Sequence, residues 1–161
     1  MRFRELRTED IAGLIPLVRD IFAENPSATW FRSEPQNSEL EEMFADKIVL
    51  MRKGDAQDIV ALDGERIVGE CEIIRVRSND AAVGIIVARE YRRKGVATRM
   101  LQRCTALAEK VGITNLYVEV SKSNAHAMKF FTASGFGEVR NDDAYGKSGG
   151  PDTVLLRKEI A

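Results

Sequence analysis

Hydrophobic residues recur along the chain with two different periods, which predicts both helices and strands. Steps of three and four residues, typical of one apolar helical face, occur in residues 11–22, 40–51 and 96–111. A fourth helix is expected between residues 124 and 135. Short alternating or continuously apolar runs, typical of strands, occupy residues 2–7, 58–62, 66–76, 81–88, 115–120, 136–140 and 153–160.

Local signals refine the ends of these elements. Thr8 is placed to cap the first helix, and Pro16 is expected to kink that helix or delay its start. Ser38 to Glu41 reads as a capping box that opens the second helix. Asp63-Gly64 predicts a tight hairpin turn. The resulting order is a strand, two helices, an antiparallel run, and then strand–helix–strand–helix–strand–strand, which predicts an α+β fold.

Composition narrows the class of protein. The 161 residues suit one domain, 1–161, and 44% hydrophobic with 30% charged residues allows a real core. A formal net charge of -1 argues against a nucleic-acid partner. Cys71 and Cys104 are expected to be small buried residues in a reducing, cytoplasmic compartment. The histidine and cysteine spacing makes no metal pattern, and no signal peptide or apolar run long enough for a membrane span is present.

A basic loop joins the strand ending near Ala88 to the helix that begins near Val96. Arg92, Arg93 and Lys94 stand beside the helix start, where N–H groups lack helical partners and the dipole is positive. Gly95 lets a ligand approach the backbone closely. The pattern predicts an anion site, although a solvated surface loop would carry the same charges.

Two motifs resemble the GNAT N-acyltransferase superfamily. Arg92-x-x-Gly95-x-Ala97 is similar to the acyl-CoA pyrophosphate loop of that family. Downstream, Asn124-x-x-Ala127 with Phe130-Phe131 and Gly135-Phe136 is similar to its second conserved block. The resemblance covers residues 66–140. It implies a GNAT-like mixed, mostly antiparallel central sheet with splayed middle strands and helices on both faces.

The resemblance also implies an enzyme that moves an acetyl group from acetyl-CoA to a primary amine by direct attack in a ternary complex. The acyl-pantetheine arm would lie between the strands ending at Ala88 and Val120. Main-chain groups would hold the cofactor, and the Asn124 side-chain amide would contact its pantetheine arm. The alternative for Asn124 is a plain helix cap, and the two roles are compatible. The residues expected to bind the cofactor are Ile86, Val87, Ala88, Arg92, Arg93, Lys94, Gly95, Val96, Ala97, Asn124 and Phe131.

Phe131 departs from the family, which places a tyrosine there as the proposed general acid. One interpretation is that the enzyme works without this acid, because a thiol with a pKa near ~8.5 is a tolerable leaving group. Another is a non-catalytic acyl-CoA-binding sensor or interaction module. A third, a nucleotide-phosphate binder, uses the same loop but leaves the Asn124 block unexplained.

The sequence leaves the general base and the acceptor open. Glu70 is the first candidate base and Glu119 the second, both catalytic candidates, whereas His126 is a weaker one. Glu72 shares the face of Glu70 by alternation and is assigned to the substrate pocket. Trp30, Phe31, Glu72 and Tyr145 are expected to bind a cationic amine. A small-molecule amine is favoured over a peptide amine, and the chain is expected to be a monomer or homodimer.

Overall fold

The computed structural model describes residues 1–29, 31–140 and 152–161, and in this part seven strands form one sheet in the order β1-β2-β3-β4-β5-β7-β6. The strands are β1 (Arg2–Glu5), β2 (Ala56–Asp63), β3 (Arg66–Arg77), β4 (Asp80–Val87), β5 (Asn115–Ser121), β6 (Gly137–Glu138) and β7 (Thr153–Glu159). The α-helices are α1 (Ile11–Glu24), α2 (Asn37–Arg52), α3 (Val96–Lys110) and α4 (Ala125–Ala133).

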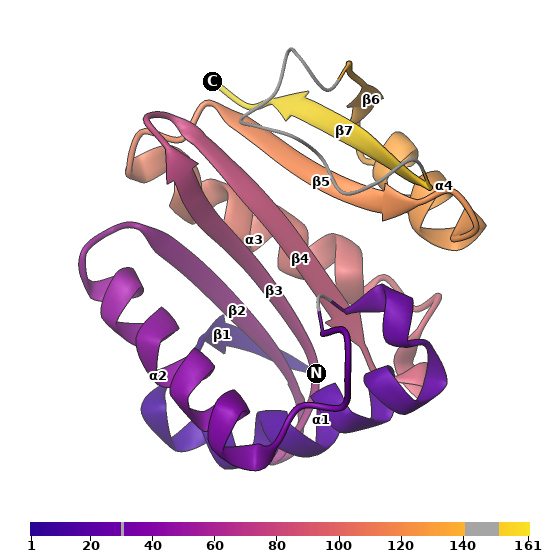
Figure 1. Ribbon diagram of the computed structural model, residues 1–161. Coiled ribbons are helices and arrows are strands. Elements are labelled where there is room, and N and C mark those ends of the chain that lie inside the picture. The colour runs from indigo at the N-terminus through magenta and orange to yellow at the C-terminus, as the bar shows by residue number, and fades with distance from the viewer. Residues whose placement is uncertain (30, 141–151) are drawn as a thin grey trace.

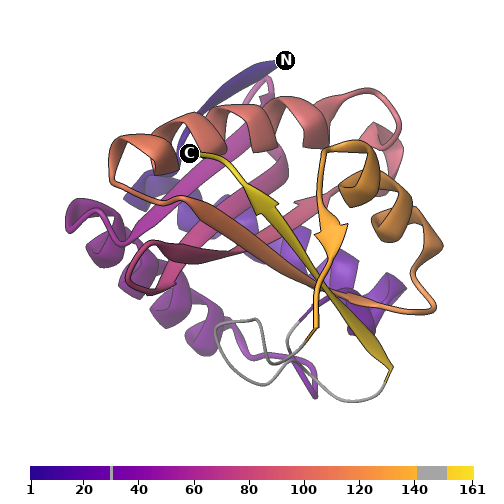
Figure 2. The ribbon, with the colours of Figure 1, turned by 90° about the horizontal axis from the view of Figure 1, so that it is seen from above.

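Helices cover both faces of the sheet. Figures 1 and 2 show α1 and α2 on one face, with α3 and α4 on the other. All neighbouring strands pair antiparallel except β4 and β5. The predicted α+β class, with a mostly antiparallel sheet between helices, is therefore confirmed.

The two middle strands separate soon after they meet. β4 and β5 pair in parallel only at Asp80–Asn115, Ala81–Leu116 and Ala82–Tyr117, and beyond these positions they diverge (Figure 1). Among the described residues, no further ladder pairing joins the facing edges of β4 and β5 beyond these three positions. This is the splay that the sequence resemblance implied.

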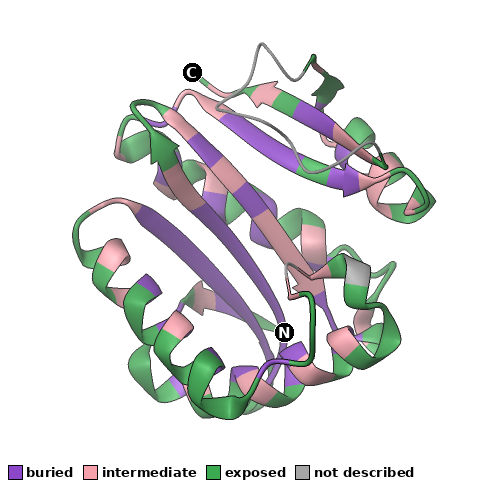
Figure 3. Cartoon of the chain, in the orientation of Figure 1, coloured by how far each residue is buried: buried purple, intermediate pink, exposed green. Residues whose placement is uncertain are grey.

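The core lies around the neighbouring strands β2 and β3, which run between the two helical layers. Seven of the eight residues of β2, Ala56 to Leu62, are buried, and most of β3 is buried as well (Figure 3). Apolar side chains such as Leu14, Phe44 and Met100 fill both sides. Polar residues on these two strands are consequently removed from water along with the apolar ones.

Several predicted boundaries were wrong in detail. A short 3-10 turn, Thr8–Asp10, precedes α1, and the Asp10 carboxylate rather than Thr8 accepts the N–H of Arg7 at 2.8 Å. Pro16 lies inside α1 and does not delay its start.

The start of the second helix and the turn of the first hairpin also differ from the predicted positions. Glu39 accepts the N–H of Gln36 at 3.1 Å, so the box that opens α2 lies two residues before the predicted Ser38. Asp63 pairs with Arg66, which leaves Gly64, with a φ of 62°, inside the turn. The strand predicted at residues 136–140 is only Gly137–Glu138.

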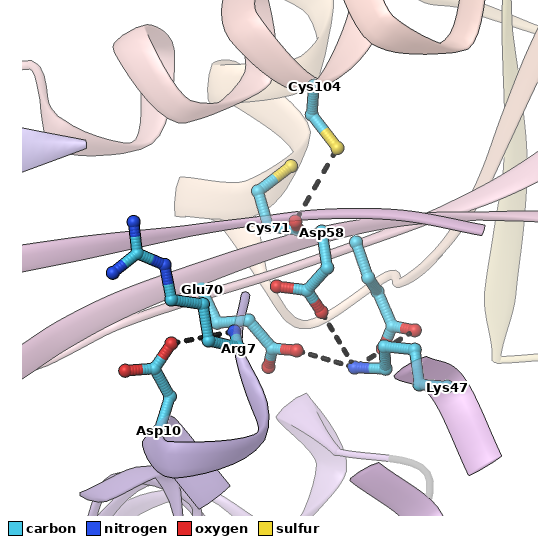
Figure 4. Close-up of polar contacts among 8 residues, drawn as sticks. Arg7, Asp10, Lys47, Asp58, Glu70, Cys71 and Cys104 are labelled. Carbon is cyan, nitrogen blue, oxygen red and sulfur yellow. Dashed lines mark hydrogen bonds and ion pairs between the residues drawn. The ribbon is translucent and has the colours of Figure 1, made fainter. Parts of the chain in front are cut away.

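The two cysteines are free and buried, as the sequence predicted. Cys104 of α3 donates its S–H to the carbonyl oxygen of Cys71 of β3 at 3.5 Å (Figure 4). Burial raises the pKa of the Cys71 thiol, so it stays protonated and behaves as a small core residue.

Candidate active site

The basic loop meets the start of α3 in a left-handed conformation. Gly95 is the N-cap residue with a φ of 79°, and Arg93 has a φ of 61°, unusual for a residue with a side chain. The loop follows a 3-10 turn, Arg89–Tyr91, and residues 92–95 are exposed. The first N–H groups of α3, including those of Val96 and Ala97, have no helical acceptor. The loop therefore presents main-chain donors and cations to solvent, an arrangement suited to phosphate.

Side chains of the loop are partly committed to protein contacts. Arg92 donates from Nε to the carbonyl oxygen of Val87 at 3.0 Å, and its guanidinium pairs with Glu24 at the end of α1. A guanidinium nitrogen of Arg93 lies 3.3 Å from Nε2 of His126 on α4. Arg92 thus ties the loop to the strand before it, while Arg93 contacts the helix across the splay.

The end of β4 offers one main-chain donor to the space between β4 and β5. Ala88 donates its N–H to the carbonyl oxygen of Val68 at 2.8 Å, so that donor is occupied by β3. Donors alternate between the two edges of an antiparallel strand, so Ile86 also faces β3 and the N–H of Val87 points away from it. Of the three predicted residues 86–88, Val87 is the one placed to donate across the splay.

A cavity of about 600 Å³ lies beside the diverging strands. It is walled by residues of α1, α2, β3, β4, β5 and α4, so both helical layers contribute. Most of its wall is apolar, with carboxylates set among the apolar groups, the usual character of a small-molecule site. Its charged lining residues are Glu70, Glu72, Glu119 and Asp152.

Asn124 and Phe131 both line this cavity from the α4 side. The Asn124 side chain accepts the N–H of Ala127 at 3.1 Å, so it does cap α4. Phe131 is buried and meets Phe130 and Phe136 edge to face, with ring centroids 5.1 and 5.2 Å apart. Phe131 therefore shapes the wall of the cavity and brings no hydroxyl to it.

A buried lysine joins the carboxylates on the α2 side. Lys47 Nζ lies 3.0 Å from Asp58 Oδ2, 2.5 Å from Glu70 Oε1 and 3.5 Å from Glu72 Oε2 (Figure 4 labels the first three residues). The lysine comes from α2, the aspartate from β2 and the glutamates from β3. Asp58 and Glu72 stand directly opposite each other in the sheet, where two like charges repel. We call these four residues the Lys47 cluster.

Burial and mutual charge give members of the Lys47 cluster different pKa values. Burial raises the pKa of Asp58 well above its usual range, and the Glu70 carboxylate adds to this. Burial is the strongest single influence on Glu70 and acts against its ionised form, but the Lys47 ammonium and a hydrogen bond with Asp58 together outweigh it and lower the pKa of Glu70. Burial raises the pKa of Glu72 to about 7, with Lys47 pulling it down and Glu70 pushing it up.

Lys47 itself remains charged. Burial alone would lower its pKa, but the carboxylates of Glu70, Asp58 and Glu72 together raise it above the ordinary value. At neutral pH the cluster therefore holds an ionised Lys47–Glu70 pair and a Glu72 that is close to half ionised, while burial favours the protonated form of Asp58. A carboxylate with such a pKa is suited to exchanging protons at neutral pH.

The structure brings three of the predicted carboxylates, Glu70, Glu72 and Glu119, to one cavity, together with Phe31. Glu70 and Glu72 do share one face of β3, as alternation predicted, because both contact Lys47. Trp30 and Tyr145 lie outside the described residues.

Two residues were missed by sequence reasoning, Lys47 and Asp58. Lys47 follows Leu40 and Phe44 at helical steps of four and three, so its position on the apolar face of α2 was the available signal. Asp58 was hidden as the only acidic residue within an otherwise apolar strand run.

Two further searches of the described residues concern metals and membranes. Within residues 1–29, 31–140 and 152–161, no three His, Cys, Asp or Glu side chains are grouped to hold a metal ion. Every helix in those same ranges is too short or too polar to cross a bilayer.

A family model and solved structures of acetyltransferases match this chain. The family model described as the acetyltransferase (GNAT) family matches residues 16–136. No curated protein matches the chain significantly.

Solved structures share the fold over nearly the whole chain. PaiA N-acetyltransferase from Thermoplasma acidophilum, in complex with coenzyme A, is 19% identical with a TM-score of 0.80, covering 99% of this chain and 98% of that one. Ribosomal-protein-alanine N-acetyltransferase from Brucella melitensis is 19% identical with a TM-score of 0.80, covering 99% and 100%. The protein yncA from Salmonella typhimurium, in complex with acetyl-CoA, is 14% identical with a TM-score of 0.80, covering 99% and 94%.

Proposed function

Because the chain belongs to the GNAT acetyltransferase family, we propose that it transfers the acetyl group of acetyl-CoA to a primary amine by direct attack in a ternary complex. The observation that carries this proposal is the cavity beside the diverging β4 and β5. Residues of the cofactor motif, Asn124 and Phe131, and the carboxylates Glu70 and Glu72 line the same space. An acyl donor and an amine can therefore meet there without leaving the protein.

The cofactor is assigned to the loop and the strand edge. The N–H groups of Arg93 to Ala97 would hold the pyrophosphate, with the cations Arg93 and Lys94 beside it. The Arg92 side chain already donates to Val87 and pairs with Glu24, which supports a structural role for it: Arg92 fixes the loop against these two residues. The N–H of Val87 would donate to the thioester oxygen, where negative charge develops during attack.

We assign the general base to Glu72 in place of Glu70. Glu70 is paired with Lys47 at 2.5 Å and has a lowered pKa, so it is a weak proton acceptor. Glu72 lines the cavity and has a pKa raised to about 7. Glu119 is exposed in the same cavity and is assigned a secondary part, attraction of the cationic amine.

The proton balance of the reaction follows from that assignment. Glu72 takes one proton from the substrate ammonium, and the neutral amine attacks the thioester carbonyl carbon. The N–C bond forms, the C–S bond breaks, and the electron pair leaves with sulfur. The second proton lost by the nitrogen goes to the thiolate, while protonated Glu72 returns its proton to solvent. No phenol is required at Phe131, because a thiol with a pKa of about 8.5 leaves without strong acid assistance.

The walls of the cavity indicate the kind of amine. On the α1 and α2 side the wall is formed by Val18, Ile21, Phe31, Met43 and Phe44, next to the two glutamates of β3. Carboxylates attract an ammonium group and repel an adjacent carboxylate, whereas the apolar wall favours a hydrocarbon body. These features support a small-molecule primary amine on an apolar group over an amino acid or a peptide.

A specific observation also keeps a second function in view. Phe131 lacks the hydroxyl that the family tyrosine carries, which fits a domain that binds acyl-CoA without turning it over. The two functions are separated by following free thiol with acetyl-CoA and a panel of arylalkyl amines, polyamines, amino acids and peptides. Turnover with any amine supports the acetyltransferase. Tight coenzyme binding by calorimetry with no thiol release across the panel supports the sensor.

A further inference from the structure

Lys47 occupies a position on α2 that its helix would normally give to an apolar residue. It follows Phe44 on the buried face, and its ammonium lies 4.6 Å from the centre of the Phe44 ring. The side chain is only 4% exposed. Burying an ammonium group is costly unless it is paired, so the three carboxylates around it are what make this position tolerable.

The charges of the cluster do not balance if every group is ionised. One ammonium would then face three carboxylates with little water to screen them. Asp58 is the member best placed to stay protonated, because it is fully buried and its Oδ1 has no hydrogen-bond partner among the described residues. An ionised oxygen in that position would lose more solvation than a neutral one. The groups left to carry charge are then Lys47, Glu70 and, when it is ionised, Glu72.

We propose that Lys47 is a positioning residue for acetyl transfer, which pairs with Glu70 and so leaves Glu72 as the carboxylate that exchanges a proton with the acceptor amine. The inference rests on the function proposed above. The distances give the division of labour, since Nζ is 2.5 Å from Glu70 but 3.5 Å from Glu72. Lys47 neutralises the charge of the closer carboxylate, Glu70. It stabilises ionised Glu72 more weakly, so Glu72 can still gain and lose a proton.

Groups on every element around Glu72 enter this balance. α1 contributes only apolar side chains, Val18 and Ile21, to the shared cavity, and β4 places Gly84 opposite Glu72. The titratable or charged groups that face Glu72 or share its cavity are Lys47, Asp58, Glu70, Tyr117, Glu119 and Asp152. Lys47 is the one cation among these described groups, so its removal leaves the negative neighbours unopposed.

The test uses two variants with opposite expected signs, Lys47→Met and Glu70→Gln. Both preserve side-chain volume closely. For each, kcat/KM is measured from pH 5.5 to 9.5 with one fixed amine. Lys47→Met removes the positive neighbour, so the acidic midpoint should rise by about one pH unit. At pH 6.5 the variant should lose up to about tenfold, and at pH 9 the loss should disappear. Glu70→Gln removes a negative neighbour, so the midpoint should fall.

A purely structural role would lower activity at every pH without moving the midpoint, and that result overturns the proposal. Midpoints that move in the same direction in both variants overturn it as well. If Lys47→Met does not fold, Glu70→Gln and the double variant Lys47→Met/Glu70→Gln carry the test. The double variant removes the pair as a neutral unit and should restore a midpoint near that of the wild type.

A readout without substrate separates this inference from the proposed function. The carboxyl carbon of Glu72, assigned by its loss in Glu72→Gln, can be titrated by NMR in protein labelled at glutamate. Its midpoint should move upward in Lys47→Met and downward in Glu70→Gln. These shifts in a protein that turns over no amine would refute the acetyltransferase but keep the assigned charge arrangement. Turnover with an unmoved Glu72 midpoint would refute the part assigned to Lys47 alone.

Discussion

The basic loop at residues 92–97, where we propose that pyrophosphate binds, and the Lys47 cluster are built from different parts of the chain. The loop is contiguous, its residues 92–95 are exposed, and Gly95 at its end has a left-handed conformation. The Lys47 cluster is buried and depends on side chains from α2, β2 and β3 that are far apart in sequence. A main-chain site tolerates most side-chain changes except at its glycine, whereas a cluster of buried charges responds to the loss of any single group.

The largest effect is expected in the Lys47 cluster, from Glu72→Gln. A general base typically contributes about 10²–10⁴-fold, so kcat/KM for the amine should fall at least about 100-fold at pH 8. The KM for acetyl-CoA should change little, because the loop is not touched. Steady-state kinetics check both values, and Glu119→Gln is the comparator. A greater loss in Glu119→Gln than in Glu72→Gln would contradict the assignment of the base.

The same substitution lowers activity but should raise stability relative to the wild type as pH increases. The pKa of Glu72 is about 7 when folded, above the ordinary value of 4.5 expected when unfolded. Between these values the folded protein binds more protons, so its free energy of unfolding falls as pH rises through this window. The contribution is fully present below about pH 4.5 and is lost above pH 7, a difference of about 3 kcal/mol.

Glutamine cannot titrate, so Glu72→Gln should gain on the wild type by that amount between pH 4.5 and pH 8. Urea unfolding of both proteins at the two pH values measures this gain. An equal stability difference at both pH values would show that Glu72 does not carry the raised pKa.

At the loop end, Gly95→Val should raise the KM for acetyl-CoA by about tenfold or more. A φ of 79° costs a side-chain-bearing residue about 1–2 kcal/mol, and a branched side chain also blocks approach of phosphate to the backbone. Gly112 is a matched control, since it ends α3 with a φ of 86° and also has open space beside it. Gly112→Val should lose similar stability while keeping the KM. Equal KM values in the two variants would place the phosphate elsewhere.

The smallest effect is expected where neither region is altered, in Phe131→Tyr. The new hydroxyl would sit on the cavity wall and could protonate the leaving thiolate, so kcat should rise by no more than about threefold if chemistry limits turnover. KM values for both substrates should stay the same. Pre-steady-state thiol release measures the chemical step directly, and a fall in that rate would show that the Phe131 packing matters more than the missing acid.

The comparison also explains how much could be predicted from sequence. The loop was found because its chemistry is local, with Arg92, Gly95 and the helix start adjacent in the chain. The helices, the sheet and the splay followed from periodicity and from the resemblance of two motifs. Boundaries slipped where local hydrogen bonds decided them, as at Asp10 and Gln36.

Only part of the Lys47 cluster could be predicted from the sequence. Alternation placed Glu70 and Glu72 on one face, but nothing local showed that a lysine from α2 would pair with the first of them. The proposal of Glu72 as the base rests on the distances of 2.5 and 3.5 Å from that lysine to Glu70 and Glu72. Such distances arise only after α2 packs on β2 and β3, so the sequence alone led to the prediction of Glu70.

The central claim is that one cavity joins coenzyme held at the start of α3 to an amine activated by Glu72. A crystal structure of the protein grown with acetyl-CoA tests it most directly. The account predicts the pyrophosphate on the N–H groups of Arg93 to Ala97, and the thioester between the N–H of Val87 and the carboxylate of Glu72. A coenzyme bound away from the splay of β4 and β5, or a thioester that points away from Glu72, would contradict it.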